Sequence, residues 1–152
     1  MVTNVPTTPL SIKLGIREDS TLVVLRAPKS FVLEISPSVL LSRRLRGRAD
    51  VIVAFFTKAS ELEEQLDTLG QSIAPSGGLW IAWPKKSSGV STDLTDEVVR
   101  GLALPLGLVD NKVCAVDETW TALRFVWRRT MRRTVDRRGV EPEPLDRPDD
   151  LQ

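Results

Sequence analysis

The sequence has 152 residues, which is the usual length of one compact domain. It is 41% hydrophobic and 27% charged, and 21 basic against 20 acidic residues leave a net charge of +1. This composition excludes collagen-like and wholly disordered chains, and no apolar run approaches the roughly 18–20 residues of a membrane-spanning helix. Because the chain has no histidine and a single cysteine, Cys114, we expect neither an internal disulfide nor a metal site.

The composition divides the chain into a lead-in, one domain and a tail. Residues 1–11 are rich in Thr and Pro, so we expect a flexible lead-in. Residues 12–130 hold the alternating apolar and amphipathic segments and form the expected single domain. Residues 131–152 are highly charged, with prolines among acids toward the end, and we expect a largely disordered tail.

The first half of the domain begins with an apolar, β-branched run. Residues 21–25 are typical of a strand that is covered on both faces, and 31–35 form a second, shorter extended run. The pair Ser36-Pro37 has the residue types of an N-cap and a first helical position, which predicts a helix to Arg46. Residues 50–56 then predict another fully buried strand.

The second half continues the alternation of helices and strands. We expect a helix that starts at the capping box Ser60–Glu63 and has apolar residues at helical spacing to Ile73. A Pro-Ser-Gly-Gly turn over 75–78 and a strand over 79–83 should follow. The last predicted elements are a helix from about Asp93 or Thr95 and a hairpin of strands 112–116 and 123–127. This order predicts an α/β fold with a three-layer, Rossmann-like and mostly parallel sheet. The last strand, which closes the hairpin, is expected to be antiparallel.

Two segments carry a resemblance to the carboxyl-terminal half of class I methyltransferases that depend on S-adenosylmethionine (SAM). Residues 50–56 resemble the strand at the centre of their sheet, and residues 73–81, Ile-Ala-Pro-Ser-Gly-Gly-Leu-Trp-Ile, resemble their helix end, turn and next strand. The resemblance implies a reduced methyltransferase-like topology, because the link between the first and next long strands is too short for the full fold.

The part of the chain that would hold the cofactor departs from the methyltransferase pattern. That family has a glycine-rich turn after the first strand, whereas residues 26–30 here are Arg-Ala-Pro-Lys-Ser. Where an acid would bind the ribose, about 20 residues on, the sequence has residues 44–46, Arg-Leu-Arg. Glu34 could substitute only if residues 31–35 pair beside the first strand. We therefore expect no bound cofactor.

A closer resemblance covers residues 14–129. The runs 80–95 and 107–120 are similar to a family of short bacterial proteins catalogued as domain of unknown function 3052. This resemblance implies a bacterial, cytoplasmic protein and brings no established activity with it.

Candidate ligand-binding residues gather at one edge of the expected sheet, because ligands bind beyond the carboxyl ends of parallel strands. Ammonium groups, hydroxyls, a glycine and a helix N-terminus suit an anion there. The candidates for this anion site are Lys85, Lys86, Ser87, Ser88, Gly89 and Thr92, with Lys29, Trp83, Asp117, Glu118 and Trp120 expected on the same edge. The structural alternative is that Lys85 and Lys86 are solvated loop charges and that Trp120 folds back over the hairpin.

These observations support three hypotheses of different classes. The first is a non-catalytic, methyltransferase-like module that binds a protein partner or a small anionic ligand. The second is a small transferase that uses Lys85, Lys86 and Asp117. The third, which we disfavour because the arginines lack interleaved aromatic residues, is a nucleic-acid accessory protein that uses the arginines of 43–48 and 128–138. No membrane partner is expected, and homodimer formation is left open.

Overall fold

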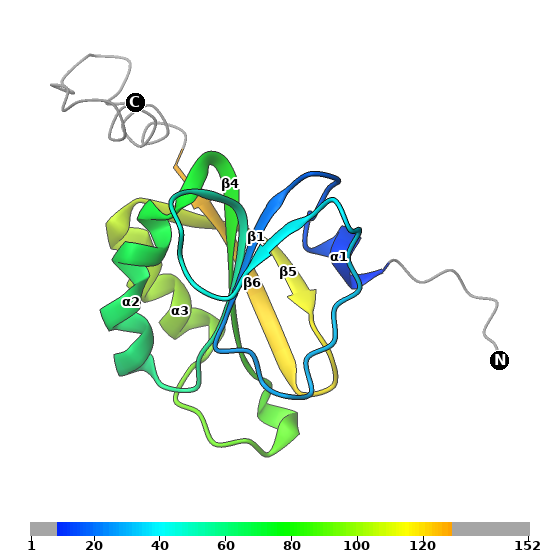
Figure 1. Ribbon diagram of the computed structural model, residues 1–152. Helices are drawn as coiled ribbons and strands as arrows, with labels where there is room; N and C mark the ends of the chain where they lie inside the picture. Colours follow the sequence, from blue (N-terminus) through cyan, green and yellow to red (C-terminus); the bar gives the residue numbers. More distant parts are fainter. Residues whose placement is uncertain (1–8, 129–152) are drawn as a thin grey trace, which may run out of the picture.

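A six-stranded sheet forms the body of the protein in the computed structural model, which describes residues 9–128. The expected tail over 131–152 and most of the expected lead-in lie outside the described residues. The strands are β1 (Thr21–Leu25), β2 (Leu40–Ser42), β3 (Ala49–Phe55), β4 (Ile73–Pro84), β5 (Leu108–Ala115) and β6 (Trp120–Trp127), and the helices are α1 (Leu10–Lys13), α2 (Ala59–Gln71) and α3 (Asp96–Ala103), with short 3-10 turns η1 (Lys86–Ser88) and η2 (Leu104–Leu106) (Figure 1).

The order of the strands across the sheet is β2-β1-β3-β4-β6-β5. The pairs β1–β2, β1–β3 and β3–β4 are parallel, whereas β6 is antiparallel to both β4 and β5. The predicted mostly parallel, Rossmann-like sheet with a carboxyl-terminal antiparallel hairpin is therefore confirmed. The hairpin does not simply extend the sheet outward, because its second strand inserts between β4 and β5.

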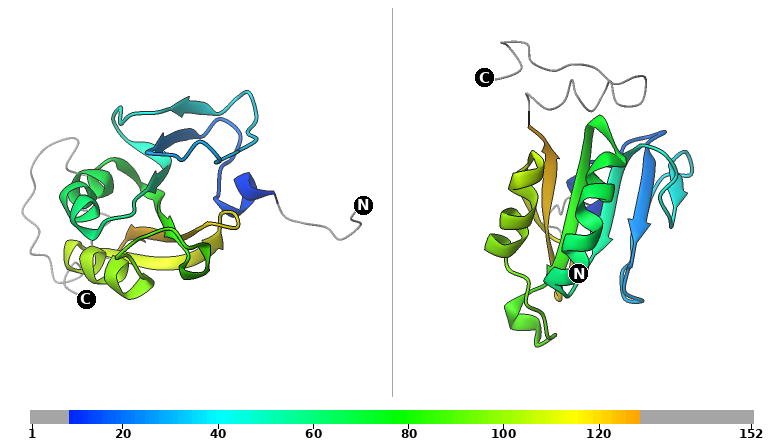
Figure 2. Two further views of the ribbon diagram at one scale, coloured as in Figure 1. Left: turned by 90° about the horizontal axis from the view of Figure 1, so that it is seen from below. Right: turned by 90° about the vertical axis from the view of Figure 1, so that its left-hand side faces the viewer.

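The two faces of the sheet are covered differently. Helices α2 and α3 lie together on one side, where leucines of α2 and the buried Val99 and Ala103 of α3 pack on the strands (Figure 2). The opposite face is covered by α1 and by the irregular segment 27–35, whose partly buried Phe31, Leu33 and Ile35 pack on the strands. The third layer of this sheet is thus mostly irregular chain rather than helix.

The predicted helix over 36–46 is wrong, because this segment forms a turn followed by the edge strand β2. The Ser36 hydroxyl accepts from the backbone N–H of Ser38 at 3.3 Å, and the backbone N–H of Val39 donates to the carbonyl of Ser36 at 3.0 Å. Serine hydroxyls often close such turns as an alternative to capping a helix. Leu40 then pairs with Thr21 of β1, so the tertiary pairing decides the conformation.

The start of α2 also differs from the prediction. Ser60 lies inside the first turn of the helix, and the N-cap residue Lys58 makes no side-chain capping bond. The carboxylate of Asp93, which is distant in sequence, accepts from the backbone N–H of Ala59 at 2.8 Å. The capping-box prediction was therefore wrong, because a carboxylate from another loop takes over the capping role.

The predicted turn over 75–78 is part of a strand. Helix α2 ends at Gln71, and β4 begins at Ile73 and pairs with β3 through a register shift between Ala49 and Val51. Glycine is required in this stretch because the strand passes close to the backbone of β3. A Cβ on Gly77 would lie 2.7 Å from the carbonyl oxygen of Asp50, which is too close for any real side chain.

Candidate functional site

The carboxyl end of β1 is closed by the side chain of Arg26. This residue has a φ of +62°, in the left-handed region that glycine favours. Its Nε donates to the carbonyl oxygen of Phe55, the last residue of β3, at 3.0 Å, and its guanidinium forms an ion pair with Glu61 of α2. The guanidinium also lies 4.7 Å from the ring centroid of Phe56. Arg26 therefore bridges the ends of β1 and β3 on the side of the sheet that α2 covers.

Aromatic rings fill the other side of the same edge. The rings of Phe31 and Phe55 meet edge to face with centroids 4.9 Å apart, and Phe55 meets Trp120 in the same way at 5.2 Å. Trp120 is only 8% exposed and packs on Phe55 of β3, so it belongs to the core and is not an exposed contact at the loop tip. Such edge-to-face contacts stabilise the closed edge beyond the area that they bury.

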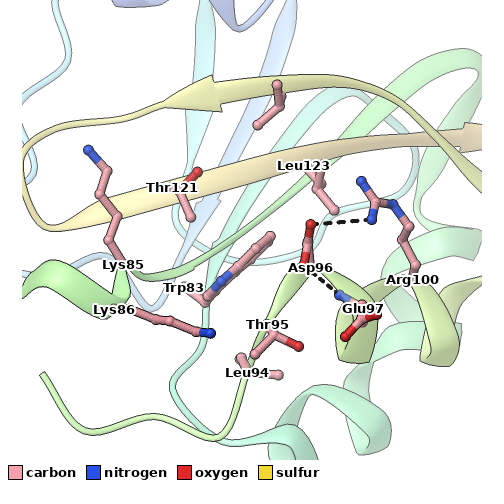
Figure 3. A pocket seen from close by; sticks show the side chains of 11 residues that line it. Trp83, Lys85, Lys86, Leu94, Thr95, Asp96, Glu97, Arg100, Thr121 and Leu123 are labelled. Carbon is pink, nitrogen blue, oxygen red and sulfur yellow. Dashed lines mark hydrogen bonds and ion pairs between the residues drawn. The ribbon is translucent and has the colours of Figure 1, made fainter.

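An open pocket of about 530 Å³ lies further along the sheet, between the hairpin and the N-terminus of α3. The indole of Trp83 stands at its centre, with Thr121 and Leu123 of β6 on one side and α3 on the other (Figure 3). Its lining residues are Trp83, Lys85, Lys86, Leu94, Thr95, Asp96, Glu97, Arg100, Val113, Thr121 and Leu123.

Lys85 and Lys86 are the free cations of this pocket. Among the described residues, neither ammonium group takes part in an ion pair or hydrogen bond. The two side chains diverge: Lys86 extends past Trp83 toward Thr95, and Lys85 extends toward the hairpin (Figure 3). The backbone N–H of Lys85 donates to the carbonyl of Thr119 at 2.8 Å, which fastens the lysine loop to the hairpin.

The other residues of the predicted anion site serve the loop itself. The Ser88 hydroxyl donates to the carbonyl of Lys85 at 2.7 Å, and Gly89 takes a φ of +79° that turns the chain. The Thr92 hydroxyl donates to the carbonyl of Thr57 at 2.7 Å and lies at a separate pocket beside Asp93. Neither these residues nor Ser87, which lies in η1, line the pocket of Lys85 and Lys86.

The N-terminus of α3 already has partners for two of its backbone N–H groups. The Thr95 hydroxyl accepts from Val98 at 3.1 Å, and the Asp96 carboxylate accepts from Glu97 at 2.9 Å. These N–H groups are therefore committed within the helix, and the carboxylates of Asp96 and Glu97 make this wall of the pocket negative. The sequence predicted that the N-terminus of this helix would help to bind an anion, and the structure does not support that prediction. The cationic part of the pocket is the side that holds Lys85 and Lys86.

Arg100 is held on the same helix by two carboxylates. Its Nε donates to Asp110 of β5 at 2.9 Å, and its second contact, with Asp96, is 3.4 Å long. The hydrogen bond to Asp110 raises the pKa of Arg100 above its ordinary value, and both carboxylates add to this effect. Arg100 thus ties α3 to β5 and is not a free cation for a ligand.

The expected partners of the lysines at this edge lie elsewhere. The Asp117 carboxylate accepts from the backbone N–H groups of Thr119 and Trp120, both at 2.8 Å, and so closes the hairpin loop. Glu118 and Lys29 are exposed, and neither lines the pocket. Of the predicted residues, the structure brings together only Trp83, Lys85 and Lys86.

Several pocket residues were missed from the sequence. Thr121 and Leu123 line the pocket because β6 lies beside β4, and Pro84 pairs with Trp120 in that register. The sequence placed 123–127 beside the preceding strand only, so nothing in it brought these residues next to Trp83. The helical spacing of the α3 residues was visible, but not the face that meets the hairpin.

Comparisons with known proteins concern the fold alone. No family model and no curated protein match the sequence. Among solved structures, magnesium protoporphyrin IX methyltransferase (ChlM) from Synechocystis PCC 6803 with bound SAM is similar, with a TM-score of 0.53 and 9% identity over 78% of this chain and 74% of that one. Ribosomal protein L11 methylase from Lactobacillus delbrueckii subsp. bulgaricus gives 0.51 and 12%, over 78% and 76%.

A third similar structure is a TehB-like SAM-dependent methyltransferase from Corynebacterium glutamicum, with a TM-score of 0.51 and 8% identity over 77% of this chain and 85% of that one. The chain has a methyltransferase-like fold. It spans 50% of the length of another similar structure, that of the LepI complex with SAM. Because one fold hosts many functions, the ligand has to be argued from the residues.

The residues at the end of β1 do not fit SAM. Arg26 occupies the turn where the resemblance implies glycines, and its guanidinium and the Phe31 ring lie on the two sides of that edge. β2 ends at Ser42, and residues 43–48, which follow it, hold four arginines and no acid. Glu34 is exposed, and its segment does not pair with β1, so it cannot take the place of the missing acid.

Two further structural findings limit the kind of site. Within residues 9–128, no group of three or more cysteine, aspartate and glutamate side chains is arranged to hold a metal ion. No helix in this part of the chain is both long and apolar enough to cross a membrane.

Proposed function

We propose that this chain is a non-catalytic binding module with a methyltransferase-like fold, and that it binds an anionic ligand rather than SAM. The ligand site is the pocket of Trp83, Lys85 and Lys86. The observation that carries the proposal is the closure of the cofactor edge by Arg26 on one side and by Phe31, Phe55 and Trp120 on the other. We also propose that the protein is bacterial and cytoplasmic, and this part of the proposal rests on the sequence resemblance alone.

The chemistry of the pocket supports a ligand with one anionic end and one apolar part. An unpaired ammonium at about 4 Å from an anion contributes roughly 1 kcal/mol in water and more where water is displaced. Trp83, Leu94 and Leu123 offer an apolar wall, whereas Asp96 and Glu97 repel an anion from the α3 side. The anionic end would therefore meet the lysines, and the apolar part would meet the indole.

The transferase hypothesis finds less support in the geometry. It needs Asp117 as an acid or base beside the lysines, but that carboxylate already accepts two backbone N–H groups of its own loop. The nucleic-acid hypothesis rests on residues 43–48 and 128–138, and all of the second cluster except Arg128 lies outside the described residues. We therefore retain the binding module as the conclusion.

Thermal unfolding and calorimetry of the full chain test this proposal. SAM should leave the midpoint unchanged, whereas phenyl phosphate, which has an anionic end and an apolar ring, should raise it in a saturable way. Lys85→Ala combined with Lys86→Ala should weaken phenyl phosphate binding about tenfold or more. Lys29→Ala removes an exposed lysine outside the pocket and should have no effect. A saturable response to SAM, or equal losses in the Lys29 control, would overturn the proposal.

A further inference from the structure

The strand β5 leaves one side of the sheet open. Among the described residues it is the outermost strand and pairs with β6 alone. The backbone N–H of Val116 donates to the carbonyl of Trp120, so the alternation of an antiparallel ladder directs the backbone groups of Cys114 toward β6 and those of Val113 and Ala115 outward. Within residues 9–128, no other backbone group bonds to Val113 or Ala115 on the open side.

This open edge lies between two pockets, one on each face of the sheet. The pocket of Trp83 lies on the face that α3 covers, and a second pocket of about 380 Å³ lies on the other face. Val113, which is 72% exposed, lines both of them. The second pocket is lined by Lys13, Trp80, Lys112, Val113, Cys114 and Ala115. Successive side chains of a strand added to β5 would enter the two pockets in turn.

Each of the two pockets holds two lysines. Lys85 and Lys86 belong to the first pocket, and Lys13 and Lys112 belong to the second. In the part of the chain that the structure describes, none of the four forms an ion pair. Asp96 and Glu97 offset the lysines of the first pocket on its α3 side, but no acidic residue is among those that line the second pocket. The charge beside β5 therefore favours an acidic occupant, and it disfavours a second copy of the chain, because paired β5 edges would bring lysines together.

We propose that the β5 edge binds an extended acidic segment of a partner protein by strand addition. The backbone groups of Val113 and Ala115 bind the main chain of the segment, and the four lysines bind its carboxylates. The inference rests on the proposed function only in that the Lys85–Lys86 pocket takes an anionic group. It adds the class of the ligand, a protein segment, and the strand that binds it.

The test uses the full chain and a blocked octapeptide of alternating glutamate and valine, with binding measured by calorimetry. Two control peptides are matched to it: one has glutamine in place of glutamate, and the other is N-methylated at every residue and so has no main-chain donors. We expect each change to weaken binding about tenfold or more. Lys112→Ala should also weaken it, whereas Lys29→Ala should not.

Ala115→Pro tests the edge of the protein itself. The N–H of Ala115 points away from β6, so proline removes a donor of the open side without removing a bond of the sheet. Because Ala115 does not line the pocket of Trp83, the variant should lose octapeptide binding and keep phenyl phosphate binding. If the variant does not fold, the N-methylated peptide still tests the inference. Binding of that peptide as tight as that of the unmodified octapeptide would overturn strand addition.

The remaining outcomes separate this inference from the proposed function. Phenyl phosphate binding without octapeptide binding would overturn the edge site and leave the proposed function intact. Octapeptide binding without phenyl phosphate binding would overturn the small-ligand pocket and leave the edge site. A dimer by light scattering that Ala115→Pro dissociates would overturn the inference in favour of pairing between two copies of β5.

Discussion

The closure of the cofactor edge by Arg26 can be measured as stability. The Arg26 guanidinium makes three contacts that stabilise the fold. Its charged hydrogen bond to Phe55 contributes about 1.5 kcal/mol, at the low end of the usual range. The exposed ion pair with Glu61 and the contact with the Phe56 ring contribute about 0.5 kcal/mol each. The low values apply because the Arg26 side chain is 45% exposed. Against them stands a left-handed backbone, which costs a residue other than glycine about 1 kcal/mol.

These magnitudes predict an order of stability for three variants. Arg26→Ala loses the contacts and keeps the backbone cost, so the free energy of unfolding should fall by about 2–3 kcal/mol. Arg26→Gly loses the same contacts but relieves the backbone, so it should be about 1 kcal/mol more stable than Arg26→Ala. Glu61→Ala should cost about 0.5 kcal/mol.

Urea unfolding followed by tryptophan fluorescence would measure this series. If Arg26→Ala and Arg26→Gly were equally stable, the cost assigned to the left-handed backbone would be refuted. If Arg26→Gly were more stable than the parent protein, the stabilisation assigned to the side-chain contacts would be refuted. Arg26→Gly should also stay unresponsive to SAM, because Phe31, Phe55 and Trp120 still fill the edge. A response to SAM gained by this variant would show that the rings do not block the site.

Three other predictions follow from particular contacts. Gly77→Ala should destabilise by about 2 kcal/mol or more, because the new Cβ meets a backbone carbonyl, whereas Gly78→Ala, which meets a movable arginine side chain, should cost about 1 kcal/mol or less in the same unfolding assay. Asp93→Ala should cost about 1 kcal/mol through the lost cap of α2, and Ser60→Ala, matched in that first turn, should cost much less; equal losses would contradict the cap. Burial raises the pKa of the Cys114 thiol above its ordinary value of 9.0, so its alkylation at pH 8 should be slow until the protein unfolds. Because the unfolded chain ionises this thiol first, stability should be constant below that ordinary value and fall as the pH rises above it, which chemical unfolding at several pH values would show.

The strands with strong local patterns could be predicted from the sequence. The apolar runs that became β1 and β3 are largely buried, and such β-branched runs are typical of strands in a parallel sheet between covering layers. The Thr95 cap of α3 was one of the two expected starts and is the observed one. These elements depend on local residues, so one sequence was enough.

The failures occurred where a distant residue decides the local structure. The segment 36–46 has the residue types of a helix start, but it becomes the edge strand β2 because β1 offers it a partner. The cap of α2 comes from Asp93, which lies 34 positions from the N–H it binds. The pocket depended on the insertion of β6 between β4 and β5, and no periodicity in the sequence reports the order of strands.

The irregular chain that replaces a helix on one face of the sheet closes the edge at Phe55. In place of a helix after β1, the chain has the irregular segment 27–35, which brings Phe31 onto Phe55. The same face then has only the short helix α1 toward β5, anchored where the Trp80 indole donates to the carbonyl of Leu14 at 2.9 Å. A helix of one turn covers little of a face, so within residues 9–128 the lysine pocket beside Cys114 is left uncovered. The residue types after β1 therefore close the edge at Phe55, whereas the edge that we propose for partner binding lies at β5, on the far side of the sheet.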